Sequence, residues 1–108
     1  MCSYKTLHRN EEGYVVYCQN CECMHIGFGT TVLLKSVDEF YEFGAQVEHA
    51  HQKELATEHA NLKTILINTS SDAVTLLYSL NDLKKLVRLL NKAKERLTLE
   101  KLFVFHDN

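Results

Sequence analysis

The chain has 108 residues, of which 45% are hydrophobic and 24% charged, values typical of one globular domain. No apolar stretch reaches the roughly 18–20 residues that a membrane-spanning helix requires. The net charge of −2 argues against a general binder of polyanions. The first residues lack the apolar run of a secretory signal, so we expect a cytoplasmic protein whose four cysteines stay reduced.

The first third of the chain is predicted to form β strands. Residues 4–8, 14–18, 23–28 and 31–35 are rich in β-branched, aromatic and apolar residues. Turn residues separate these segments: Gly13 is able to adopt a positive φ, and Gly29 and Thr30 interrupt the later strand. We therefore expect an N-terminal hairpin followed by a further pair of strands.

An amphipathic helix is predicted to follow from residue 36 to about residue 60. Ser36 and Glu39 have the spacing of a capping box. Apolar residues then recur at spacings of three and four, which is the helical period. Gly44 falls within this stripe and suggests a close approach of the helix to a sheet. The predicted stripe comprises Val37, Phe40, Tyr41, Gly44, Val47, His51 and Leu55.

The second half is predicted to repeat this plan, with strands at residues 62–68 and 73–78 and a turn between them. Ser79 is a candidate N-cap, and the acid at Asp82 suits the positive end of a helix dipole. Residues 99–105 either extend the helix or add an edge strand. The predicted apolar stripe of this helix comprises Leu80, Leu83, Leu86, Val87, Leu90, Ala93 and Leu97.

Residues 32–40 align with residues 75–83, so that strand, serine cap, acid and first apolar helical residue coincide. This similarity predicts a duplicated ββα unit, although any strand followed by a serine-capped helix would show it. We expect one α+β domain over residues 1–108, in which a hairpin precedes two ββα units. Residues 1–60 would contain the hairpin and the first unit, and residues 61–108 the second unit and tail. The strands would form one mostly antiparallel sheet with both helices on one face.

The two predicted helices differ in charge, since the first carries mainly acids and the second mainly bases. Two solvated faces would give this pattern, as would pairing between the helices or a self-complementary dimer surface. The basic helix could also contact phosphates, which makes nucleic-acid binding an alternative function. The residues that would then bind are Lys84, Lys85, Arg88, Lys92 and Arg96.

Cysteines cluster between residues 18 and 23, and this cluster supplies the candidate site. Cys18 and Cys21 form a C-x-x-C pair, a spacing that lets a tight turn direct two thiolates at one zinc ion. If residues 21–25 are extended, Cys21, Cys23 and His25 share one face, so these residues and Cys18 are the candidate metal ligands. Cys2 and His8 could also complete the site.

Other interpretations of the cluster remain open. The cysteines could be buried, reduced residues that act as small hydrophobes. They could form a redox pair, with Cys18 as the nucleophile and Cys21 as the resolving thiol. An iron–sulfur cluster held by Cys2, Cys18, Cys21 and Cys23 is a further alternative. The second C-x-x-C pair of a zinc ribbon does not occur in the sequence.

The pattern Tyr14-x-Val16-x-Cys18-x-x-Cys21, followed after six residues by Phe28-Gly29, resembles a small uncharacterised bacterial family of Bacteroidetes type. The resemblance implies a bacterial cytosolic single-domain protein of unknown function, with the C-x-x-C as its candidate metal or structural pair. We expect a non-enzymatic interaction or regulatory module with a protein partner or with itself. A structural zinc would join the first hairpin to the next strand.

Overall fold

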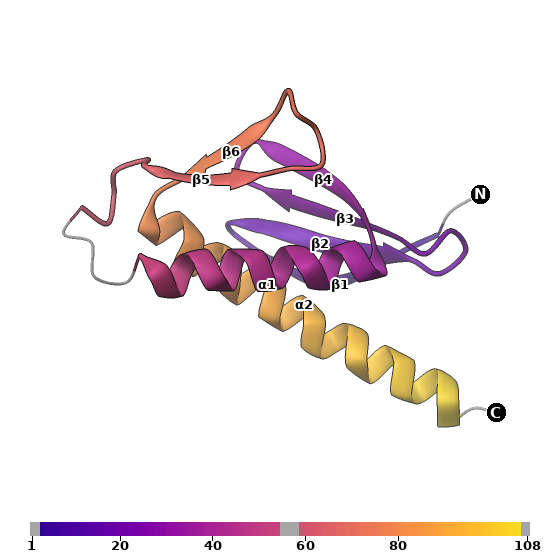
Figure 1. Ribbon diagram of the computed structural model, residues 1–108. Coiled ribbons are helices and arrows are strands. Elements are labelled where there is room, and N and C mark those ends of the chain that lie inside the picture. Colours follow the sequence, from indigo (N-terminus) through magenta and orange to yellow (C-terminus); the bar gives the residue numbers. More distant parts are fainter. Residues whose placement is uncertain (1–2, 55–58, 107–108) are drawn as a thin grey trace.

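The computed structural model describes residues 3–54 and 59–106, with side chains described through Glu100. β1 to β4 form an antiparallel sheet in chain order, and β5 pairs with β6 in a second sheet. The elements are β1 (Tyr4–Asn10), β2 (Gly13–Cys18), β3 (Cys23–Phe28), β4 (Thr31–Ser36), α1 (Val37–Lys53), β5 (Ile65–Asn68), β6 (Thr75–Tyr78) and α2 (Leu80–His106) (Figure 1).

The predicted α+β class and antiparallel pairing are confirmed, but the prediction of a single sheet is wrong. β5 lies against α1, and the Gln46 side-chain amide donates a hydrogen bond to the Asn68 carbonyl over 3.2 Å. The short hairpin is therefore held along the helix. Its alternate residues Ile65, Ile67 and Leu76 are buried in the common core, so the hairpin contributes to that core without joining the larger sheet.

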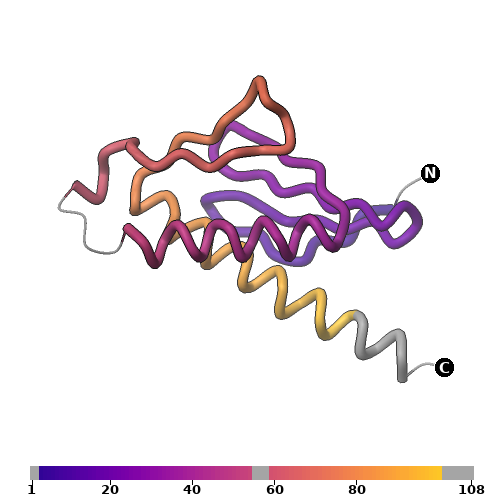
Figure 2. The backbone as a smooth tube through the Cα atoms, in the orientation of Figure 1, coloured from indigo at the N-terminus to yellow at the C-terminus, as the bar shows by residue number. Residues whose placement is uncertain are grey.

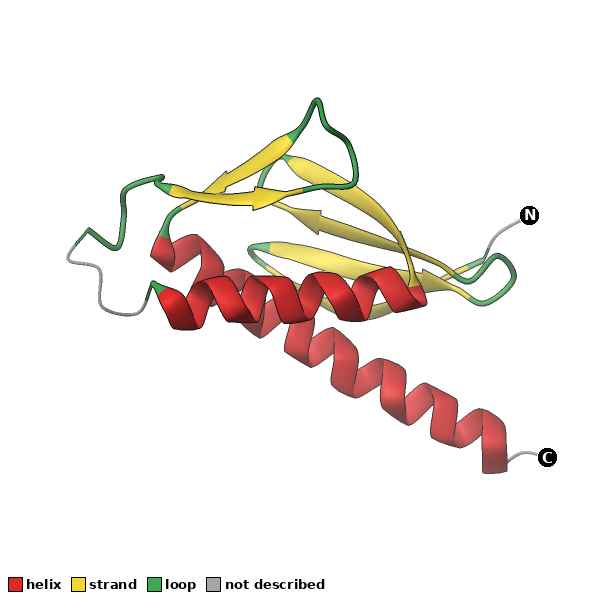
Figure 3. Cartoon of the chain, viewed as in Figure 1, coloured by secondary structure: helices red, strands yellow, loops and turns green. Residues whose placement is uncertain are grey.

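One face of the four-stranded sheet carries the core. Val15 pairs with Ile26, and Ile26 pairs with Leu33, so these three side chains point to the same side of neighbouring strands. α2 packs against β1 and β2, α1 packs against β4, and the two helices pack against each other. Figure 3 shows both helices on one side of this sheet. The expected placement of the helices on one face thus agrees with the structure.

Both helices begin at a serine, as the sequence predicts. Ser36 accepts a hydrogen bond from the Glu39 backbone N–H, and its own N–H donates to the Glu39 carboxylate over 2.8 Å. This capping box satisfies backbone groups that the first turn of a helix leaves without a partner. Ser79 and Asp82 make the same reciprocal pair of hydrogen bonds at the start of α2.

The ends of the helices differ from the prediction in one case. α1 ends at Lys53 rather than near residue 60, and Val47 is its last fully buried side chain, so packing no longer stabilises a longer helix. Leu55, the last residue of the predicted stripe, lies outside the described residues. α2 continues through the tail to His106, which confirms the helical alternative, and it projects beyond the sheet (Figure 2).

Two glycines have opposite structural roles. A Cβ atom at Gly13 would lie 1.9 Å from the Gly27 carbonyl oxygen, so the strand pairing there requires glycine. A Cβ atom at Gly44 would meet no atom within 4 Å. The expectation that Gly44 marks a close helix–sheet approach is therefore wrong, since Gly44 lies beside a shallow hollow between α1 and α2.

We predict that Gly13→Ala destabilises the protein by about 2 kcal/mol or more, because the new methyl group must displace backbone. Gly44→Ala is the matched control and should stabilise the protein by about 0.5–1 kcal/mol, because alanine is the better helix former. Urea denaturation of the two variants checks both values. Equal effects of the two substitutions would contradict the geometry of the β2–β3 pairing.

Candidate functional site

The cysteine cluster lies at the turn between β2 and β3. Cys18 ends β2 and pairs with Cys23, which begins β3. Residues 19–22 form the turn, and Glu22 adopts a left-handed φ of 53° there. The bend that the C-x-x-C spacing predicts is therefore present. Cys21 lies in this turn rather than in an extended segment, so the expected shared face of Cys21, Cys23 and His25 does not form.

The three thiols differ in their surroundings. Cys18 is fully buried, Cys23 is half-buried and Cys21 is exposed. Burial raises the pKa of the Cys23 thiol, and the neighbouring Cys21 and Cys18 raise it further. Burial also raises the pKa of Tyr17, with additional contributions from Glu22, Cys18 and Cys21. A raised thiol pKa disfavours the thiolate that nucleophilic chemistry needs. Cys18, the nucleophile of the redox hypothesis, has no solvent-exposed surface.

The remaining candidate ligand, His25, interacts with Tyr4 of β1, two strands away in the sheet. Its Nε2 atom lies 3.1 Å from the Tyr4 hydroxyl, and the two rings lie 4.7 Å apart. Among the side chains described in residues 3–54 and 59–100, no three of His, Cys, Asp or Glu converge as a metal site. His8 lies on β1. Cys2 falls outside the described residues, so its predicted contribution to a metal site or an iron–sulfur cluster has no counterpart in the structure.

The face of the four-stranded sheet opposite the helices carries exposed apolar side chains. One row of the register joins Thr6, Val16, His25 and Leu34 across all four strands. The next row joins Tyr4, Cys18, Cys23 and Ser36. Neither row contains Lys, Arg, Asp or Glu. Leu34 is 64% exposed, and Val32, which lies on the same side of β4, is 52% exposed.

This surface, which we name the bare face, is a candidate functional feature that the cysteine-centred sequence prediction missed. Its signal was the sequence Thr31-Val32-Leu33-Leu34-Lys35, in which strand alternation places Leu33 inward and Val32 and Leu34 outward. In a sheet with one buried and one solvated face, each strand normally alternates apolar with polar residues. The outward-facing Val32 and Leu34 therefore depart from that pattern.

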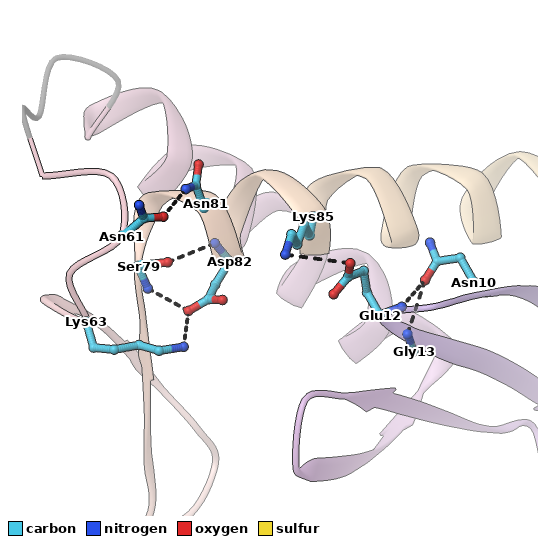
Figure 4. Close-up of polar contacts among 9 residues, drawn as sticks. All are labelled: Asn10, Glu12, Gly13, Asn61, Lys63, Ser79, Asn81, Asp82 and Lys85. Atoms are coloured by element: carbon cyan, nitrogen blue, oxygen red, sulfur yellow. Dashed lines mark hydrogen bonds and ion pairs between the residues drawn. The ribbon is translucent and has the colours of Figure 1, made fainter.

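A polar network fixes the start of α2 (Figure 4). The Asp82 carboxylate accepts hydrogen bonds from the Ser79 backbone N–H and from the Lys63 ammonium, with which it also forms an ion pair. Burial acts to raise the pKa of Asp82, but the hydrogen bonds from Lys63 and Ser79 outweigh it and lower that pKa. Asn81 extends the network by donating its side-chain amide to Asn61.

The basic residues of α2 form ion pairs with the β1–β2 turn and within the helix itself. Lys85 pairs with Glu12 in the β1–β2 turn over 3.6 Å, as Figure 4 also shows. Arg96 pairs with Glu100 within the helix, and Glu100 also pairs with Lys5 of β1. None of the ion pairs found in the described part of the chain joins α1 to α2. Neither helix, over its described length, carries an apolar stretch sufficient to span a bilayer.

A comparison with family models decides the affiliation of the chain. The model described as "Family of unknown function (DUF6686)" matches residues 1–107. The chain belongs to this family. The expected resemblance to a domain of unknown function is thereby confirmed. No curated protein and no solved structure matches the DUF6686 chain. Its functional surfaces must consequently be derived from the chain's own geometry.

We predict that the contribution of Asp82 to stability depends on pH. Because the folded-state pKa of Asp82 is lowered, its contribution is present above the unfolded pKa of about 3.9 and is lost as the pH falls through the folded value. Asp82→Asn should cost about 1 kcal/mol at pH 7, a typical value for a cap. Thermal melts at pH 7 and pH 3 should show a smaller difference between wild type and Asp82→Asn at pH 3.

The control for this measurement is Asp72→Asn, because Asp72 is exposed in the β5–β6 turn. Its difference from wild type should stay the same at both pH values. A constant difference for Asp82→Asn as well would show that the carboxylate charge contributes nothing to the cap.

Proposed function

We propose that this protein is an interaction module that binds a protein partner through the bare face of its four-stranded sheet. The observation that carries the proposal is the exposure of Val32 and Leu34 beside two rows without charged residues. Exposed apolar surface that is contiguous and rimmed by polar groups is characteristic of binding sites. A partner that covers this face would remove the apolar side chains from water.

The chemistry of the bare face suits a protein partner. Tyr4 and His25 provide rings with polar atoms at their edges, and their contact holds both side chains in place. Interface cores are enriched in aromatic residues and depleted of charged ones. Charged residues lie at the border of the face instead, since Arg9 pairs with Tyr14 in the row beyond Val16. We infer an apolar interface centre with a polar rim.

Site-specific photo-crosslinking tests the proposal. We expect a photo-crosslinking amino acid at Thr6, which is exposed on the bare face, to give one discrete adduct in cells that contain the natural partners. The same amino acid at Glu48, which is exposed on α1, should give no such adduct. Leu34→Lys, introduced with the crosslinker at Thr6, should abolish the adduct by placing a charge in the interface centre. The same adducts from the crosslinker at Thr6 and from the crosslinker at Glu48 would refute the proposal.

We propose a structural zinc ion as a second function, because three thiols gather at the β2–β3 turn and interact with one another. Cys18, Cys21 and Cys23 would supply the sulfur ligands, with His25 as the fourth candidate. Binding would require the ligands to reorganise, which the exposed position of Cys21 permits. The ion would fasten the end of β2 to the start of β3.

Metal content tests the zinc proposal directly. Native mass spectrometry of protein purified without added metal should find about one zinc per chain, and Cys21→Ser should remove it. A chelator should then lower the melting temperature of the wild type but not of Cys21→Ser. Metal-free protein whose melting temperature is insensitive to added zinc would rule the site out.

We also infer that β3–β4–α1 and β5–β6–α2 are two copies of one ββα unit. Each helix follows a hairpin, and each begins with a serine–acid capping box, at Ser36 with Glu39 and at Ser79 with Asp82. Both serines follow directly on an apolar strand. This repetition of strand, cap and helix supports a duplication.

A further inference from the structure

β4 is an edge strand whose outer side has no partner among the described residues. It pairs with β3 from Phe28↔Thr31 to Cys23↔Ser36. The Gly29 N–H donates to the Glu12 carbonyl, which shows that the odd-numbered residues of β3 bond toward β2. Even-numbered residues of β3 consequently bond toward β4, and they are paired with Thr31, Leu33 and Lys35.

The intervening residues of β4 therefore direct their backbone groups outward. The outward N–H of Ser36 is already taken, because it donates to Glu39 in the capping box. Val32 and Leu34 remain, each with one N–H and one carbonyl at the edge. The hydrogen bonds found within the described part of the chain, other than those of the sheet itself, do not involve these groups. β4 thus offers two donors and two acceptors to another strand.

The two edges of the sheet differ in how they are protected. β1 contains a register shift between Thr6 and His8 and carries Lys5, which pairs with Glu100 of α2. Bulges and lysines are the usual means of preventing edge-to-edge pairing. β4 has an uninterrupted register with β3, and its apolar side chains Val32 and Leu34 are exposed. An edge of this kind favours pairing with another strand.

We propose that β4 pairs antiparallel with β4 of a second copy of this chain, about a two-fold axis at Leu33. Val32 of each copy then lies opposite Leu34 of the other copy. The pairing uses every free backbone donor and acceptor of the two β4 edges. A register centred on Leu34 would instead set Val32 against Ser36, whose N–H is occupied. The two sheets become one continuous sheet, and the two bare faces become one surface.

The side chains of β4 suit this register. Val32 and Leu34 from the two copies form a contiguous apolar cluster on the bare face, where cross-strand pairs contribute to sheet stability. Lys35 lies opposite Thr31 of the second copy, so the two lysines do not face each other. An antiparallel pair of identical strands satisfies two-fold symmetry, so the assembly stops at a dimer. This inference rests on the proposed function and extends it, because the second copy enlarges the bare face that the protein partner would cover.

Sedimentation equilibrium of the full chain tests the proposal over micromolar to submillimolar concentrations. We expect a mass of twice 12.5 kDa for the wild type. Leu34→Lys should weaken self-association by about tenfold or more, because each lysine replaces an apolar contact with Val32 and the two like charges lie diagonally across the axis on one face. Thr6→Lys is the matched control, because it places the same charge on the same face but on β1. A wild type that stays monomeric, or an equal effect of both variants, would overturn the proposal.

Amide hydrogen exchange measured by NMR distinguishes edge pairing from face-to-face association. The N–H groups of Val32 and Leu34 should be protected in the wild-type dimer, and Val32 should exchange at least about tenfold faster in Leu34→Lys. Circular dichroism of that variant verifies that it is folded. A dimer in which both amides exchange freely would refute the β4 pairing.

The crosslinking experiment separates the failure of this inference from failure of the proposed function. An adduct at Thr6 containing another protein, together with a monomeric wild type, would overturn the β4 pairing but retain the interaction module. A dimeric wild type together with an adduct at Thr6 that contains another protein supports both. Thr6 lies on β1, three strands from β4, so an adduct of two copies of this chain would indicate that bare faces bind each other and would overturn the β4 pairing. A monomeric wild type without any discrete adduct at Thr6 would overturn both.

Discussion

The whole structure depends on a sheet that is buried on one face only. Strand alternation places Val15, Ile26 and Leu33 on one side, and both helices pack over that side. Two helices and a short hairpin suffice to cover this face, whereas the other has no cover within the described chain. The same alternation that builds the core therefore exposes Val32 and Leu34, and fold and interaction surface follow from one geometric constraint.

Polar contacts determine where each helix begins relative to the sheet. Ser36 is at once the last residue of β4 and the cap of α1, so the strand continues into the helix without an intervening loop. Ser79 is buried, and Asp82 joins it to Lys63 in the segment before β5. This connection links both ends of the second hairpin to the first turn of α2. The caps thereby restrict the directions in which the apolar stripes of the helices can point.

Local features were predictable from the sequence, and long-range ones were not. The strand at residues 23–28 and the caps at Ser36 and Ser79 depend on neighbouring residues, and they appear as predicted. The placement of the second hairpin against α1 involves long-range contacts, such as the burial of Ile65 and Ile67 in the common core, which no short pattern encodes. For the same reason the C-x-x-C spacing predicted the bend at Cys18 and Cys21, but it could not place His25 beside Tyr4.

The contrast between β1 and β4 explains why a local pattern can still locate a binding edge. An edge strand that binds no partner is protected by features that discourage pairing with another strand. In β1 these features are Lys5 and the irregular register. β4 instead carries exposed apolar side chains. The capping box of α1 uses only the last outward N–H of β4, that of Ser36. Leaving Val32 and Leu34 exposed risks nonspecific aggregation unless a specific partner covers them. A two-fold pairing limits that risk at β4, because it uses every free backbone donor and acceptor of this edge.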